Sequence, residues 1–181
     1  PEEVAKRAKF IYVNYPNNPT GAVATAAFYE ELVAWAKKYE VGVVSDFAYG
    51  ALGADGYENP SFLSTPGAKD VGIELYTFSK TFNMAGWRLA FAAGNEQLIE
   101  ALNLLQDHLF VSIFPAIQDA GAVALLDEKA KAAIAGLNQK YNERRHAFVQ
   151  AAEKIGWHAF ESKGSFYAWM PVPEGYDSES F

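Results

Sequence analysis

Three short runs of β-branched and aromatic residues constrain the fold of this chain more than any other feature. The runs are FIYVN (residues 10–14), VGVVSD (41–46) and IELYTFS (73–79), and each is almost continuously apolar. Such runs are typical of strands that are buried on both faces of a parallel sheet. Parallel neighbours need a long crossover connection, so the helical pattern between the first two runs predicts a βαβ unit.

Helical periodicity follows the first of these strands and also a fourth strand further along the chain. In residues 25–40 one face of the expected helix is apolar, and its members are Phe28, Leu32, Trp35 and Tyr39. A fourth, small-residue strand is expected at AFAAGN (90–95), followed by a helix with Asn95 as its N-cap. The apolar stripe of that helix consists of Leu98, Leu102, Leu105 and Leu109.

The character of the chain changes after this helix. Residues 114–126 are apolar or small almost all round, which predicts a buried helix. Residues 128–156 predict a long amphipathic helix that stops at Gly156. Its expected buried side consists of Ile134, Leu137, Tyr141, Phe148, Ala152 and Ile155. Residues 157–173 predict a hairpin with its turn at 162–164.

The predicted fold class is therefore α/β. A central, mostly parallel sheet is flanked by helices and is followed by a long helix and the start of a small α+β domain. We expect a partial large domain over residues 1–128, a connecting helix over 129–156 and an incomplete small domain over 157–181.

Composition and charge argue against several classes of partner. With 181 residues and 50% hydrophobic content the chain can bury a substantial core. The net charge of -7 opposes binding to nucleic acid. We expect no metal, since there is no cysteine and the three histidines lack metal-ligand spacing. Nor do we expect a membrane partner, because no apolar run approaches the ~20 residues that a spanning helix needs.

A polar cluster follows each of the first three strands: NYPNNPTG (14–21), DFAY (46–49) and SKTFNMAGWR (79–88). In open α/β sheets ligands bind outside the carboxyl ends of the strands, so these clusters could converge on one ligand. Together they supply the amine of Lys80, the carboxylate of Asp46, the phenol of Tyr49, the amide of Asn18 and the guanidinium of Arg88. That set suits an anionic ring cofactor held by a Schiff base.

The motifs NNPTG, SDFAY and SKTFNMAGWR, in this order, resemble those of the aspartate-aminotransferase-like, fold-type I pyridoxal-phosphate enzymes, near the diaminopimelate and alanine aminotransferase branches. The resemblance extends from residue 10 to 173 and implies that the sheet is part of the large cofactor-binding domain.

By the same resemblance Lys80 carries pyridoxal 5'-phosphate as the internal aldimine and moves the substrate proton. Asp46 pairs with the pyridine nitrogen, and Tyr49 and Asn18 contact the phenolic oxygen. The phosphate group is held by Thr77, Ser79 and Arg88, with Thr77 standing where the family often has serine. The catalytic residues implied are Lys80, Asp46 and Tyr49.

The implied activity is aminotransfer between an amino acid and a 2-oxo acid, by a cytoplasmic homodimer. The resemblance also implies a substrate-binding arginine after Phe181, and a ring-stacking aromatic residue and a phosphate-binding turn before Pro1, so we expect residues 1–181 alone to be inactive. Two alternatives remain open on the same fold, a carbon-sulfur lyase and the effector domain of a transcription regulator.

Overall fold

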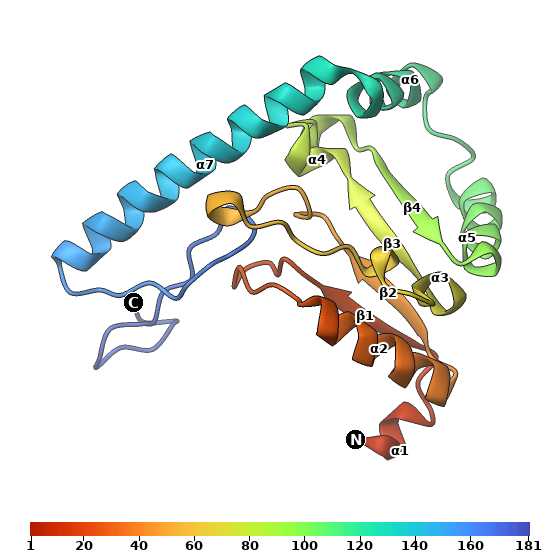
Figure 1. The fold of residues 1–181 in the computed structure, drawn as a ribbon, viewed down its shortest axis with the longest axis horizontal. Helices are drawn as coiled ribbons and strands as arrows, with labels where there is room; N and C mark the ends of the chain where they lie inside the picture. The colour runs from red at the N-terminus through yellow and green to blue at the C-terminus, as the bar shows by residue number, and fades with distance from the viewer.

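The computed structural model describes residues 1–181 and contains a four-stranded sheet with helices around it (Figure 1). The strands are β1 (Phe10–Asn14), β2 (Gly42–Asp46), β3 (Gly72–Thr77) and β4 (Ala90–Gly94). The α-helices are α1 (Glu2–Ala5), α2 (Ala26–Tyr39), α3 (Ala68–Val71), α4 (Phe78–Thr81), α5 (Glu96–Leu109), α6 (Pro115–Leu126) and α7 (Glu128–Lys154). Three short 3₁₀ helices complete the set: η1 (Ala54–Gly56), η2 (Phe62–Ser64) and η3 (Ala85–Trp87).

The sheet has the order β1-β2-β3-β4 and is mostly parallel, as predicted. The pairs β1–β2 and β2–β3 are parallel, whereas β3–β4 is antiparallel. In this register Asn14 lies beside Asp46, and Asp46 lies beside Leu75. The carboxyl ends of the three parallel strands therefore meet at one edge of the sheet.

Helix α2 covers one face of the sheet and forms the core with it. Thr25 caps the helix, since its hydroxyl accepts from the Phe28 N–H at 3.1 Å. The buried cluster consists of Ala24, Tyr29, Leu32, Val33, Ala36, Val43, Phe62 and Ala68. The predicted buried face of α2 was wrong, because the helix is rotated about its own axis relative to that prediction. The buried side of the helix consists of Tyr29, Leu32, Val33 and Ala36, while the bulky rings of Phe28 and Trp35 pack at the margin of the cluster.

A carboxyl group is buried at the edge of this core. Glu74 on β3 is 7% exposed, and its Oε1 accepts from Ser61 Oγ at 2.6 Å. Its Oε2 accepts from the Phe62 N–H at 2.8 Å and from Ser45 Oγ at 3.2 Å. Burial raises the pKa of Glu74, although these hydrogen bonds act in the opposite direction. Glu74 thereby ties β3 to β2 one residue before Asp46.

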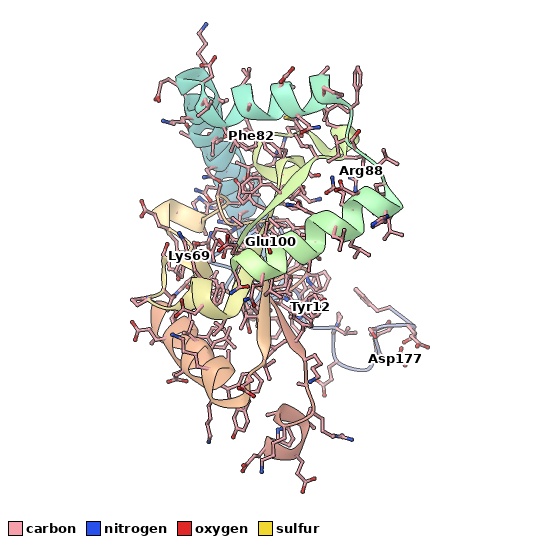
Figure 2. The ribbon with its side chains drawn as sticks, turned by 90° about the vertical axis from the view of Figure 1, so that its right-hand side faces the viewer. Tyr12, Lys69, Phe82, Arg88, Glu100 and Asp177 are labelled. Atoms are coloured by element: carbon pink, nitrogen blue, oxygen red, sulfur yellow. The ribbon has the colours of Figure 1, made fainter.

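The opposite face of the sheet is only partly covered. Tyr12 on β1 is 74% exposed and lies on the side away from α2 (Figure 2). The prediction that all three runs are buried on both faces is therefore wrong for β1, because α5 lies over β3 and β4 and no described element covers β1 on that side.

Helices α5 and α6 are also less buried than the sequence predicts. Helix α5 has no buried residue, although Asn95 caps it as predicted through the Leu98 N–H at 3.1 Å. The prediction of a buried helix at α6 was wrong, because only its Gly121 is buried. The outer faces of both helices have no partner among residues 1–181.

Helix α7 confirms the long helix and its stop, with Gly156 at φ 73° just beyond its end. Of the stripe expected to be buried, Ala152 is buried while Phe148 and Ile155 are exposed. The division of the chain into three units stays a prediction. No helix in the structure is both long and apolar enough to cross a membrane.

The hairpin predicted after α7 does not form as a pair of strands. One backbone bond, from the Phe160 N–H to the Trp169 carbonyl at 2.9 Å, crosses the segment. Its turn pairs instead with the loop that follows β2. The pairs are Gly53 with Gly164, Ala54 with Lys163 and Leu52 with Ser165. The C-terminal segment therefore lies against the carboxyl edge of the sheet.

Candidate active site

Asn14, the last residue of β1, ties the first polar loop to β2. Its Nδ2 donates to the Asp46 backbone carbonyl at 3.1 Å, and its Oδ1 accepts from the Asn18 N–H at 2.9 Å. The Asn18–Pro19 peptide bond is cis. Sequence reasoning named Asn18 but not Asn14, which brings Asn18 to the carboxyl edge of the sheet.

The second loop begins at Asp46, the last residue of β2. Asp46 is exposed, and its Oδ1 accepts from the Ala48 N–H at 3.2 Å. Tyr49 is 3% exposed, and its hydroxyl lies 3.2 Å from that of Tyr167. The loop thus places a carboxylate in solvent and a phenol in the interior, three residues apart.

Burial raises the pKa of the Tyr49 phenol well above its usual value. The hydrogen bond with Tyr167 and the nearby charge of Asp46 act in the same direction, while a hydrogen bond with the Asn18 side chain opposes them. The Tyr49 hydroxyl therefore keeps its proton at ordinary pH and can serve as a hydrogen-bond donor.

Lys80 lies in α4, directly after β3, and is half-buried. Its Nζ is 5.9 Å from the centre of the Tyr49 ring and 5.7 Å from the centre of the Phe166 ring. Aromatic faces attract an ammonium group at such distances. The amine is therefore held near two rings, and it forms no salt bridge in the structure.

The proposed phosphate group ligands are only partly assembled. Thr77 caps α4: its Oγ1 accepts from the Ser79 N–H at 3.2 Å and lies 2.9 Å from Ser79 Oγ. Arg88 is exposed, with φ 53°, and its Nη1 donates to the Ala85 carbonyl at 2.9 Å. The structure brings the two hydroxyls together, while the hydrogen bond of Arg88 is to the Ala85 carbonyl and not to either of them.

Phe166 and Tyr167 were missed as site residues, because the sequence predicted a hairpin over residues 157–173 and both lie within it. Both rings pack against Tyr49, with centroid distances of 5.4 Å and 5.8 Å. Adjacent residues of a strand point to opposite faces, so a hairpin could not bring both rings to one neighbour. The signal in the sequence was an aromatic pair directly after Gly164 and Ser165.

The two largest cavities lie away from the lysine. One, of about 610 Å³, is an apolar groove between β4, α5 and α6. The other, of about 480 Å³, is bounded by η1, α7 and the C-terminal segment, and Tyr167 contributes to its wall. Neither cavity contains Lys80, so the candidate site is the open edge of the sheet.

The comparisons with known proteins agree on the family. A family profile described as aminotransferase class I and II matches residues 1–179. The L-glutamine--4-(methylsulfanyl)-2-oxobutanoate aminotransferase of Bacillus subtilis is 56% identical over 99% of this chain and 44% of its own length. The LL-diaminopimelate aminotransferase of Moorella thermoacetica is 46% identical over 100% of this chain and 46% of its own length.

Solved structures give the same result. Substrate-bound BacF from Bacillus subtilis has a TM-score of 0.93 and 46% identity, over 98% of this chain and 44% of that one. An aminotransferase from Staphylococcus aureus has a TM-score of 0.92 and 39% identity, over 99% of this chain and 47% of that one. This chain thus spans less than half the length of these relatives. The resemblance found in its motifs is confirmed, and the chain belongs to the class I and II aminotransferase family.

Proposed function

We propose that the complete protein carrying residues 1–181 is a pyridoxal-phosphate-dependent aminotransferase, which moves an amino group between an amino acid and a 2-oxo acid. The observation that carries this proposal is the place of the Lys80 amine, near the rings of Tyr49 and Phe166 at the carboxyl edge of the sheet. Membership of the family supports it. The activity is assigned to the complete protein because this chain spans less than half the length of its relatives.

The side chains at this edge fit pyridoxal phosphate in kind and in charge. Lys80 offers an amine for the cofactor aldehyde, and Asp46 an exposed carboxylate for the ring nitrogen. Tyr49 offers a phenol that burial keeps protonated. When bound, the cofactor would supply an electron sink for the charge left on the substrate α-carbon.

Lys80 has two roles in this proposal. Its Nζ would hold the cofactor covalently in the resting protein and, when free, would accept the substrate α-proton and return it. The rings of Tyr49 and Phe166 lie near that nitrogen, at 5.9 Å and 5.7 Å from their centres. The negative charge of Asp46 would favour a proton on the ring nitrogen of the bound cofactor.

The remaining residues orient the cofactor. Asn18 and Tyr49 would bind its phenolic oxygen, and the hydroxyls of Thr77 and Ser79, 2.9 Å apart, would bind its phosphate group. Arg88 is assigned to the same phosphate group, since a guanidinium supplies the positive charge and planar donors that a phosphate group favours.

The partners proposed for the complete protein are an amino acid and a 2-oxo acid. The Bacillus subtilis and Moorella thermoacetica relatives are named for reactions of glutamine and of LL-diaminopimelate. A homodimer and a cytoplasmic location are proposed from the family resemblance.

The test uses the complete protein, loaded with pyridoxal phosphate, and a panel of amino acids without any oxo acid. We expect the visible absorption of the bound cofactor to disappear as one 2-oxo acid is released per site. Borohydride treatment before substrate should fix the cofactor to the peptide that contains Lys80. Lys80→Ala should abolish both results, whereas Lys38→Ala, on the exposed side of α2, should leave them unchanged.

Two results would contradict the proposal. Fixation of the cofactor to another lysine would remove Lys80 from its role. Release of ammonia together with pyruvate from a sulfur-containing amino acid would instead support the lyase.

A further inference from the structure

The hydroxyl of Tyr167 meets that of Tyr49 across a long separation in the sequence. The two oxygens are 3.2 Å apart, and the rings pack edge to face with centroids at 5.8 Å. Phe166 packs on the same Tyr49 ring and, through its other contacts, on Tyr141 of α7. Tyr167 is thus the polar member of an aromatic wall around the phenol.

The segment that carries Tyr167 is held firmly in place. Ser165 is 1% exposed, its N–H donates to the Leu52 carbonyl at 2.9 Å, and its carbonyl accepts from Arg145 Nη2 at 3.0 Å. The Tyr167 N–H donates to Ser165 Oγ at 3.2 Å. Both the loop after β2 and helix α7 therefore hold the backbone at Ser165, and Ser165 in turn holds the backbone of Tyr167.

The count of protons decides the direction of the contact between the two phenols. Each hydroxyl has one proton to donate and two lone pairs that accept. The bond with Tyr167 raises the pKa of Tyr49, which is the effect of a bond that Tyr49 donates. If Tyr49 instead donates its proton to the phenolic oxygen of the cofactor, it has none left for Tyr167. Tyr167 must then become the donor, and because linked hydrogen bonds polarise one another, its bond strengthens the one that Tyr49 donates.

We propose that Tyr167 is a positioning residue of the cofactor site: its hydroxyl donates to Tyr49 Oη and directs the Tyr49 proton toward the phenolic oxygen of the cofactor. This inference rests on the proposed function. It gives the segment after α7 a part in tuning the cofactor, although that segment lies outside the three polar loops of the sheet edge.

The consequence is a change in the acid–base behaviour of the bound cofactor. A hydrogen bond to the phenolic oxygen favours the charged form of that oxygen. The oxygen then attracts less strongly the proton on the nitrogen that joins Lys80 to the cofactor. Losing part of this bond should therefore raise the pH at which that proton leaves. One neutral hydrogen bond corresponds to a shift on the order of 0.5 pH unit.

The experiment titrates the visible absorption of the complete, cofactor-loaded protein without substrate. Tyr167→Phe, which keeps the ring contacts, should move the midpoint upward by about half a pH unit. Tyr49→Phe should move it further in the same direction. The double variant should match Tyr49→Phe, because Tyr167 acts only through Tyr49. Tyr176→Phe, an exposed tyrosine of the same segment, is the control and should not move it.

The outcomes separate this inference from the proposed function. If the wild-type protein shows no visible band, or borohydride labels no Lys80 peptide, the proposed function fails, and this inference fails with it. If the band is present but its midpoint is the same in Tyr167→Phe, only the role of Tyr167 is overturned. A double variant whose shift is the sum of the single shifts would also overturn it. A lower melting temperature with an unchanged midpoint would show that Tyr167 only packs.

Discussion

The Nζ atom of Lys80 lies 5.9 Å from the centre of the Tyr49 ring, so the polar loops that follow β3 and β2 meet at one edge of the sheet. The parallel pairing of β2 and β3 makes this possible, because it places both carboxyl ends together. Phe166, from the far end of the chain, lies on the same amine. The amine is thus held by parts of the chain that only tertiary folding brings together.

Asp46→Ala should lower kcat of the complete protein while the cofactor stays attached. The substitution removes the negative charge that keeps the ring nitrogen protonated, but it leaves Lys80 and the phosphate group ligands in place. A hydrogen bond to a charged group corresponds to a fall of about 10- to 100-fold. Steady-state kinetics and the visible spectrum measure the two effects. The control is Asp55→Asn at the exposed η1, and normal turnover in Asp46→Ala would refute the role.

Arg88→Ala should weaken the binding of pyridoxal phosphate more than that of pyridoxal, which has no phosphate group. Because a guanidinium contributes a charged donor, we expect the Kd for pyridoxal phosphate to rise on the order of 10- to 100-fold. Titration of the apo-protein measures both constants. Arg7→Ala, an exposed arginine near the N-terminus, should change neither. An equal loss for both ligands would show that Arg88 does not bind the phosphate group.

Glu74 should make the stability of the protein fall as the pH rises. Burial raises the pKa of Glu74 above its ordinary value of 4.5, so in this range the folded state binds more protons than the unfolded state. The contribution is complete below 4.5 and is lost as the pH rises through the folded pKa. Urea denaturation at a series of pH values should show this slope in the wild type.

Two variants of Glu74 separate its charge from its hydrogen bonds. Glu74→Gln should remove the slope while keeping an oxygen for the Phe62 N–H and a donor for Ser61. Glu74→Ala should lower the free energy of unfolding by about 1–3 kcal/mol, since it leaves the buried Phe62 N–H without an acceptor. A slope that persists in Glu74→Gln would assign it to another group.

Gly21→Ala should destabilise the protein, and Gly136→Ala should stabilise it. Gly21 has φ 71°, and a Cβ there would overlap Ser162 Oγ, so alanine would push apart the first polar loop and the C-terminal segment. We expect a loss of about 1–3 kcal/mol. Gly136 lies within α7 with open space around it, so alanine should contribute about 1 kcal/mol through helix propensity. Denaturant unfolding of both variants checks these signs; a neutral Gly21→Ala would show that this contact is easily relaxed.

Local patterns predicted the elements of the sheet well. The runs at β1, β2 and β3 were correctly identified because short, nearly continuous runs of β-branched and aromatic residues favour strands, and Asn95 was correctly identified as a helix cap. The parallel topology alone predicted that the polar loops lie together at the carboxyl edge of the sheet. Their order along the chain then identified the family.

What the sequence could not predict depends on partners from elsewhere in the chain. The rotation of α2 depends on which side chains find partners in the core, such as Tyr29 on Phe62, and periodicity does not contain that information. The sequence around the aromatic pair Phe166 and Tyr167 has the pattern of a hairpin strand. In the structure this segment pairs with the loop at Gly53 and not with the expected second strand of the hairpin. The exposed leucines of α5 had the pattern of a buried stripe, but burial also requires a neighbour.

The contact between Tyr49 and Tyr167 joins residues 118 positions apart, which has a consequence for biosynthesis. A chain emerges from the ribosome with its N-terminus first, and long-range contacts form more slowly than local ones. All four strands and Lys80 emerge before α7, and the aromatic wall emerges only after it. A nascent chain that stops before Tyr167 therefore has the reactive amine but not its enclosure, so capture of the cofactor should follow the translation of this segment.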